Sequence, residues 1–263
     1  MCGLWGIIYN RKICKLSEGG FIMAHQVKKG RTLPTTPYLF ASPSQAAHYL
    51  LEGRSLICLI RHGQTDWNLI KRLQGREDIP LNDTGREQSA KLAEYLAAAK
   101  ASGFTPSVVC SSPLSRAKDT AECIAKRLGI DSVVCESLNE RDYGALSGLT
   151  VEERRKLFPR GEKQAVPVES VPQAASRMYR AFDEILEVSG GRTVIAISHG
   201  GIINSVFSRL SQGDIGTGKT LTQNCSVSFI ASGIGHPIPL AYNIQDDGIT
   251  DYIVKMLRFG ADI

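Results

Sequence analysis

The chain has 263 residues, of which 43% are hydrophobic and 22% are charged, a composition typical of a globular protein and not of a disordered or fibrous one. The net charge of +5 arises in residues 1–54, which hold seven basic and two acidic side chains and leave 24 of each sign in the rest of the chain. No apolar stretch is long enough to cross a bilayer. We therefore expect no membrane partner and no nucleic-acid partner.

Residues 1–53 show little periodicity and contain one candidate helix, near residues 44–51. We expect them to form an N-terminal extension of uncertain role, with residues 54–263 as the main domain. The extension is basic and poor in acidic side chains, which leaves two interpretations open. It is either a segment upstream of a functional start at Met23 or a targeting peptide.

From Ser55 onward, apolar runs alternate with amphipathic stretches. Four short apolar runs predict strands buried on both faces, at 55–60, 107–111, 133–136 and 193–197. Helices are predicted at about 84–100, 115–128, 151–158, 171–188 and 201–210, two of them with capping boxes, at Thr84 with Glu87 and at Thr150 with Glu153. Two further strands, at 225–230 and 239–244, close the chain. This alternation predicts an α/β fold, a three-layer α/β/α sandwich with a mainly parallel central sheet.

The cysteines and histidines bear on compartment and on metal binding. The seven cysteines form no CxxC pair, and Cys58, Cys110, Cys135 and Cys225 lie in short apolar runs that predict buried strands. Free buried thiols are typical of a reducing compartment, so we expect a cytoplasmic protein, with organelle targeting by residues 1–53 left open. The five histidines are not spaced as zinc ligands, so we expect no metal site.

Two of the predicted strands are followed at once by a histidine and a glycine. The strand at 55–60 leads into Arg61-His62-Gly63, the strand at 193–197 leads into Ser198-His199-Gly200, and a third strand precedes Arg116. Ligands bind at the carboxyl ends of strands in open α/β sheets, so these side chains should meet at one edge. Two guanidinium groups and a helix N-terminus suit a phosphate, and a neutral imidazole beside them can attack its phosphorus.

Four segments, in this order, resemble the histidine phosphatase (phosphoglycerate mutase-like) superfamily. They are LIRHGQTDWN at 59–68, SSPLSRAKDTA at 111–121, LNERDYG at 138–144 and SHGG at 198–201. The resemblance covers about residues 55–245 and makes 54–263 the catalytic domain. It implies an enzyme whose substrate is a small phosphorylated metabolite and which acts as a monomer or homodimer.

The resemblance also implies a role for each matching residue. His62 is the expected nucleophile, which forms a phosphohistidine, while Arg61, Arg116 and His199 hold the phosphoryl oxygens. Glu140 is the expected general acid and base, and Asp142 is the nearest competitor for that role. The expected substrate contacts are Asn68, Gln74, Gly75, Arg141, Tyr143 and Gly200. The arginines supply the positive charge, so neither a metal nor another cofactor is expected.

The superfamily contains both phosphatases and 2,3-bisphosphoglycerate-dependent phosphoglycerate mutases. Arg141 and Tyr143 match positions where the mutases grip a substrate carboxylate. However, only 59 positions separate Glu140 from His199, so the long mutase insertion is absent, and the mutase HGNSLR segment is replaced here by HGGIIN. We therefore expect a phosphomonoester hydrolase. The alternatives are a mutase that uses a 2,3-bisphosphoglycerate primer and, more remotely, a non-catalytic phosphoester-binding protein.

Overall fold

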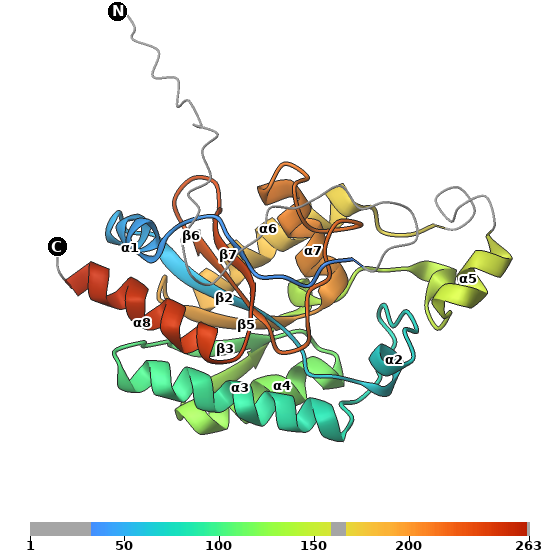
Figure 1. The fold of residues 1–263 in the computed structure, drawn as a ribbon, viewed down its shortest axis with the longest axis horizontal. Coiled ribbons are helices and arrows are strands. Elements are labelled where there is room, and N and C mark those ends of the chain that lie inside the picture. The colour runs from blue at the N-terminus through green and yellow to red at the C-terminus, as the bar shows by residue number, and fades with distance from the viewer. Residues whose placement is uncertain (1–32, 159–166, 262–263) are drawn as a thin grey trace, which may run out of the picture.

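The computed structural model describes residues 33–158 and 167–261, which form one mixed sheet of seven strands with helices on both faces (Figure 1). The order across the sheet is β1-β7-β6-β2-β5-β3-β4. The strands are β1 (Tyr38–Leu39), β2 (Ser55–Arg61), β3 (Val108–Ser111), β4 (Asp131–Val134), β5 (Val194–Ser198), β6 (Val227–Ser232) and β7 (Ile238–Ile244). The predicted three-layer sandwich is confirmed.

The parallel half of the sheet brings the important strand ends together. β5 pairs in parallel with β2 on one side and with β3 on the other, and β3 pairs in parallel with β4. Arg61 at the end of β2 is in register with Ser198 at the end of β5, and Ser111 at the end of β3 pairs with Ile197. The three segments after these strands therefore start side by side. The pairings of β2 with β6, β6 with β7 and β7 with β1 are antiparallel.

Helices cover both faces of the sheet and bury two apolar clusters. One cluster lies under α1 (Pro43–Leu51), α3 (Asp83–Ala101), α4 (Ser115–Leu128) and α8 (Asp247–Ala261). The other lies under α6 (Val171–Val188) and α7 (Gly200–Leu210). Two short helices, α2 (Asp66–Leu69) and α5 (Val151–Leu157), bury no residue and lie together beyond one end of the sheet (Figure 1). The residues at the carboxyl ends of β2, β5 and β3 therefore belong to the segments that connect these strands to the helices.

Several local predictions require correction. Helix α3 begins at Asp83 with Asn82 as its N-cap, whose side chain accepts from the Gly85 N–H, so Thr84 is not the cap. Gly85, in the first turn of α3, packs directly against the backbone of Gln64, where an added Cβ would overlap the Gln64 carbonyl. Strand β4 covers Asp131–Val134 and is exposed, because it is the edge strand and not a buried one.

The end of the chain also differs from the prediction. It closes with helix α8 and not with a strand, and Ile249, Ile253 and Met256 on α8 are buried against the core. Cys58 and Cys110 lie in strands as expected. Cys135 and Cys225 are buried but lie just outside β4 and β6.

Residues 38–51, which the sequence analysis assigned to the extension, pack on the same core as the rest of the domain. Strand β1 pairs with β7, with Tyr38 opposite Tyr242. Helix α1 is capped by Ser42, whose hydroxyl accepts from the Gln45 N–H, and its Ala46 and Ala47 are buried in the first cluster. Residues 1–32, including the alternative start at Met23, lie outside the described residues.

Candidate active site

His62 directly follows β2 and is held through its backbone and its ring. Its N–H donates to the Ser198 carbonyl at 3.0 Å, which fixes it beside the end of β5. Ring Nδ1 lies 2.6 Å from the Gly63 carbonyl oxygen. A carbonyl oxygen only accepts, so Nδ1 carries the proton and Nε2 keeps its lone pair. Burial, with the charges of Arg116 and Arg61, holds the pKa of His62 well below its usual value. The ring is therefore neutral, with Nε2 available as a nucleophile.

His199, the N-cap of α7, lies next to His62, with 5.1 Å between the ring centroids. Arg116 Nε donates to His199 Nδ1 at 3.3 Å, so the His199 proton is on Nε2, which lies 2.7 Å from Ser112 Oγ. Burial lowers the pKa of His199 well below its usual value, and the charge of Arg116 lowers it further. The two imidazoles are thus neutral and carry their protons on different nitrogens.

Arg116, on the first turn of α4, is buried, and it holds the loop that precedes α3. Its Nη1 donates to the Glu77 carbonyl at 2.7 Å and its Nη2 to the Gly75 carbonyl at 2.9 Å. With the bond to His199, these contacts use three of the five guanidinium N–H groups, and the other two suit phosphoryl oxygens. Burial lowers the pKa of Arg116 to about 10, so it is still charged at neutral pH.

Arg61 is the last residue of β2 and directly precedes His62. Its Nη1 donates to the Thr222 carbonyl at 2.6 Å, while Nε is buried and has no hydrogen-bond partner among the described residues. A Cβ on Gly200 would lie 3.3 Å from that Nε, so the glycine lets Arg61 approach the start of α7 closely. Burial lowers the pKa of Arg61 from its usual high value. The guanidinium groups of Arg61 and Arg116 therefore both act on the imidazole of His62 through their charge.

Glu140 is bound to the N-terminus of α7. Its Oε2 accepts from the Gly201 N–H at 2.9 Å, and its Oε1 accepts from the Ile202 N–H at 2.7 Å and from the Arg141 N–H at 2.8 Å. The first N–H groups of a helix favour an anion, so α7 fixes this carboxylate in place. The charge of Glu140 raises the pKa of both Arg61 and Arg116 against the effect of their burial, so it acts within electrostatic range of both.

Asp142 and Tyr143 follow Glu140 but lie differently. Asp142 is about half exposed, and its carboxylate accepts from the Gly144 N–H and lies 3.9 Å from Arg76. Among the described residues its hydrogen bonds and ion pair join it to Gly144, Glu169 and Arg76, whereas the Glu140 carboxylate binds the start of α7 directly after His199. Geometry therefore favours Glu140 for the acid role. The Tyr143 hydroxyl lies over Gly201, where an added Cβ would overlap it and would come within 2.8 Å of Glu140 Oε1.

The other predicted substrate contacts divide into two groups. Gly75 has a left-handed backbone (φ 54°) and its carbonyl binds Arg116, so it lies beside the site, and the preceding Gln74 is buried. Asn68 Oδ1 accepts from Asn224 Nδ2, which also donates to the His62 carbonyl. Arg141 donates from Nε and Nη2 to the Glu169 carbonyl, so part of its guanidinium is used within the protein.

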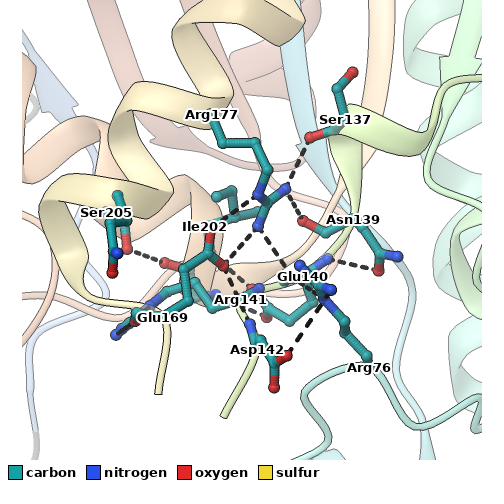
Figure 2. A network of polar contacts seen from close by, with 12 residues as sticks. Arg76, Ser137, Asn139, Glu140, Arg141, Asp142, Glu169, Arg177, Ile202 and Ser205 are labelled. Atoms are coloured by element: carbon teal, nitrogen blue, oxygen red, sulfur yellow. Dashed lines mark hydrogen bonds and ion pairs between the residues drawn. The ribbon is translucent and has the colours of Figure 1, made fainter. Parts of the chain in front are cut away.

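Sequence reasoning missed Arg177 and Glu169, which support the Glu140 loop from behind (Figure 2). Arg177 projects from α6 and donates to the carbonyls of Ser137, Asn139 and Glu140, while Glu169 binds its guanidinium through both carboxylate oxygens. An arginine on an amphipathic helix usually lies in solvent. The one signal in the sequence was that Arg177 directly precedes Met178, which is buried on the apolar face of α6.

The described residues contain neither a metal-binding cluster nor a membrane-spanning helix. Across 33–158 and 167–261, no group of three His, Cys, Asp or Glu side chains is arranged to hold a metal ion. In the same residues, each helix is too short or too polar to span a bilayer.

This geometry agrees with a family match that covers most of the chain. The family model of the histidine phosphatase superfamily (branch 1) matches residues 57–245. The chain belongs to this superfamily. The match includes all the site residues described above, whereas β1, α1 and α8 lie outside it.

Relatives in the superfamily include phosphatases and mutases. The chain is 34% identical over 174 residues to an uncharacterized phosphatase, PhoE, of Bacillus subtilis, covering 66% of this chain and 86% of the relative. It is 32% identical over 210 residues to a 2,3-bisphosphoglycerate-dependent phosphoglycerate mutase of Parvibaculum lavamentivorans, covering 74% and 92%. A phosphoserine phosphatase of Entamoeba histolytica, solved with 3-phosphoglyceric acid, superposes with a TM-score of 0.60 at 26% identity, covering 73% and 98%. The chain is therefore a phosphatase-type or mutase-type enzyme of this superfamily.

Proposed function

We propose that the protein is a phosphomonoester hydrolase that acts through a phosphohistidine on His62. The observation that carries this proposal is the hydrogen bond between His62 Nδ1 and the Gly63 carbonyl, which leaves the lone pair on Nε2, in a buried position within electrostatic range of Arg61 and Arg116. A free lone pair facing a phosphoryl group whose charge is neutralised by two guanidiniums is the arrangement that nucleophilic phosphoryl transfer needs.

The reaction has two steps that balance in atoms and protons. The cycle starts with Glu140 in its protonated form. His62 Nε2 attacks phosphorus, the ester P–O bond breaks, and Glu140 gives its proton to the leaving oxygen. Water then attacks the phosphohistidine, the P–N bond breaks and inorganic phosphate leaves, while Glu140 takes a proton from the water. Arg61, Arg116 and His199 stabilise the charge on the phosphoryl oxygens in both steps.

The same arrangement supports catalysis without a metal. Arg61 and Arg116 supply positive charge at the positions where metal ions serve in other phosphoryl-transfer enzymes. The free cysteines of the described chain support action in a reducing compartment such as the cytoplasm. We propose a small phosphorylated metabolite as the substrate, in keeping with the phosphoserine and 3-phosphoglyceric acid named for relatives with solved structures.

The first test measures hydrolysis of an aryl phosphate with a chelator present. We expect the wild-type protein to release phosphate at an unchanged rate and His62→Ala to abolish release, because no other group replaces Nε2. A brief reaction stopped with base should trap an acid-labile phosphoryl group on His62. Turnover that needs Mg²⁺, or that survives the substitution, contradicts the proposal. Absence of any labelling by phosphate donors supports a non-catalytic phosphoester-binding protein instead.

Phosphoglycerate mutase activity is the second candidate, because a mutase is among the relatives and is matched over 92% of its length. The absence of the long mutase insertion between Glu140 and His199 favours the hydrolase. An assay with 3-phosphoglycerate and its bisphosphate primer separates the two. Fast formation of 2-phosphoglycerate with little phosphate release identifies a mutase, and phosphate release without isomerisation identifies a hydrolase.

A further inference from the structure

Arg177 uses every donor of its guanidinium. Nη1 donates to the carbonyls of Ser137 and Asn139 at 2.9 and 2.8 Å, and Nη2 donates to the Glu140 carbonyl at 3.1 Å. Nε and the second N–H of Nη2 bind the two carboxylate oxygens of Glu169, at 2.9 and 2.8 Å. These five bonds account for all five N–H groups of an arginine. Three of them end on one short stretch of backbone, which includes the main chain of Glu140 itself (Figure 2).

Glu140 is thus fixed at two separate points. Arg177 on α6 holds its main-chain carbonyl, while the start of α7 holds its carboxylate through the N–H groups of Gly201 and Ile202. The loop between Leu138 and Gly144 is not paired with a strand, so these side-chain contacts take the place of the backbone hydrogen bonds that a sheet would supply. A general acid must lie within hydrogen-bond reach of the leaving oxygen, so a small shift of this loop has a large effect on its use.

The partner of Arg177 is itself held in the charged state. Arg177 and Glu169 have side chains that are only 17% and 13% exposed, so neither could easily be buried alone. Burial raises the pKa of Glu169, but hydrogen bonds and charge from Arg177, with the Asp142 N–H, outweigh it and leave the pKa below its usual value. The ion pair therefore persists at neutral pH and keeps the Arg177 fork aimed at the loop.

We propose that Arg177 is a positioning residue that sets Glu140 for proton transfer to the leaving group. This inference rests on the proposed function, because it takes Glu140 as the general acid. It predicts a defect that depends on the leaving group. A good leaving group departs without a proton, so only esters with poor leaving groups should need Glu140 in the correct place.

The test compares kcat/KM for 2,4-dinitrophenyl phosphate and for phenyl phosphate, since this quantity reports the steps up to phosphorylation of His62. Lysine keeps the charge beside Glu169 but has three donors and no planar fork, so Arg177→Lys loosens the loop without leaving a buried unpaired acid. We expect Arg177→Lys to lower kcat/KM for phenyl phosphate about 10- to 100-fold and for 2,4-dinitrophenyl phosphate less than about threefold. Glu140→Gln should show the same selectivity, with a larger loss of kcat/KM for phenyl phosphate.

Arg180→Lys is the matched control, because Arg180 is on the same helix but exposed to solvent. It should match the wild type with both substrates. If Arg177→Lys does not fold, the double variant Arg177→Met/Glu169→Gln, which removes both charges, takes its place in the same comparison. Combining Arg177→Lys with Glu140→Gln should add no further loss, because the group being positioned is already absent.

The outcomes separate this inference from the proposed function. If Glu140→Gln slows phenyl phosphate selectively but the Arg177 variants slow both esters equally, or neither, the positioning role is wrong and the proposed function stands. If Glu140→Gln itself shows no selectivity, Glu140 is not the acid, and the proposed role of Glu140 and this inference both fail.

Discussion

The two histidines at the site differ in which ring nitrogen carries the proton. His62 carries its proton on Nδ1, which donates a hydrogen bond to the Gly63 carbonyl. His199 carries its proton on Nε2, because its Nδ1 accepts a hydrogen bond from Arg116. This pairing needs neutral rings, which burial and the nearby guanidiniums favour. A protonated His62 would have no lone pair for phosphorus, so the lowered pKa is a condition for the proposed chemistry.

We predict that both rings stay neutral at pH 6. Ring-nitrogen NMR at this pH should show His62 as the Nδ1–H tautomer and His199 as the Nε2–H tautomer, with signals assigned by His62→Gln and His199→Gln. The unfolded chain takes up protons on both histidines near pH 6.5, whereas the folded protein does not. Stability should therefore fall as pH drops below that value, and less so in His62→Gln. An imidazolium signal from His62 at pH 6 contradicts the prediction.

Gly201 is required for space and not for backbone freedom. A Cβ there would overlap the Tyr143 hydroxyl and crowd Glu140 Oε1. We expect Gly201→Ala to displace Glu140 and lower kcat/KM for phenyl phosphate on the order of 10- to 100-fold, within the usual contribution of general acid–base catalysis. Gly260→Ala is the control, since a Cβ there meets nothing within 4 Å, and it should have wild-type activity. Equal activity of the two variants would show that Glu140 is not crowded.

Single residues also show how far sequence reasoning reaches into the site. Arg61, His62, Arg116 and His199 could be placed together because each follows or lies near a strand end, and strand ends are visible in apolar runs. Arg177 could not, since its contacts are with backbone carbonyls 37 to 40 residues away. Carbonyls carry no side-chain pattern, so this support is visible only in three dimensions.

At the scale of elements, regular helices and strands were predicted well and their ends less well. Helices α4 and α6 have the predicted bounds, because Gly129 ends one in a left-handed conformation and Ser170 with Gln173 caps the other. The start of α3 was misplaced because two residues, Asn82 and Thr84, could each serve as its cap. Asn82 is the cap in the structure, where Gly85 packs against Gln64. These two residues are 21 positions apart in the sequence, so local patterns do not reveal their contact.

Helix α8 was missed although its apolar spacing was visible at 249, 252, 253 and 256. The buried face of α8 packs on α1 and α3, so it should contribute to the free energy of unfolding of the whole domain. We expect Ile253→Ala to destabilise the protein by about 2–5 kcal/mol, the usual cost of such a core truncation. Urea unfolding measures this, with the exposed Lys255→Ala as control, which should change stability by less than about 0.5 kcal/mol. A small effect at Ile253 would mean that α8 is not part of the core.

At the scale of the whole molecule, the alternation of strands and helices was sufficient to predict the three layers and the parallel strands. The role of residues 38–51 was not apparent, because β1 is only two residues long and α1 is nine, too short to give a strong periodic signal. Both become stable only through partners at the far end of the chain, β7 and α8. Elements that depend on distant partners are those that local patterns predict least reliably.

The sheet order also determines when the protein can fold during its synthesis. Strand β2 pairs only with β5 and β6, whose residues leave the ribosome more than 130 positions later. Until then both of its edges are open, and unpaired apolar edges promote association between chains. A fragment that stops before Val194 would carry β2, with His62 directly after it, without either of its pairing partners. We expect such fragments to be insoluble, because both partners of β2 lie in the last 70 residues of the chain.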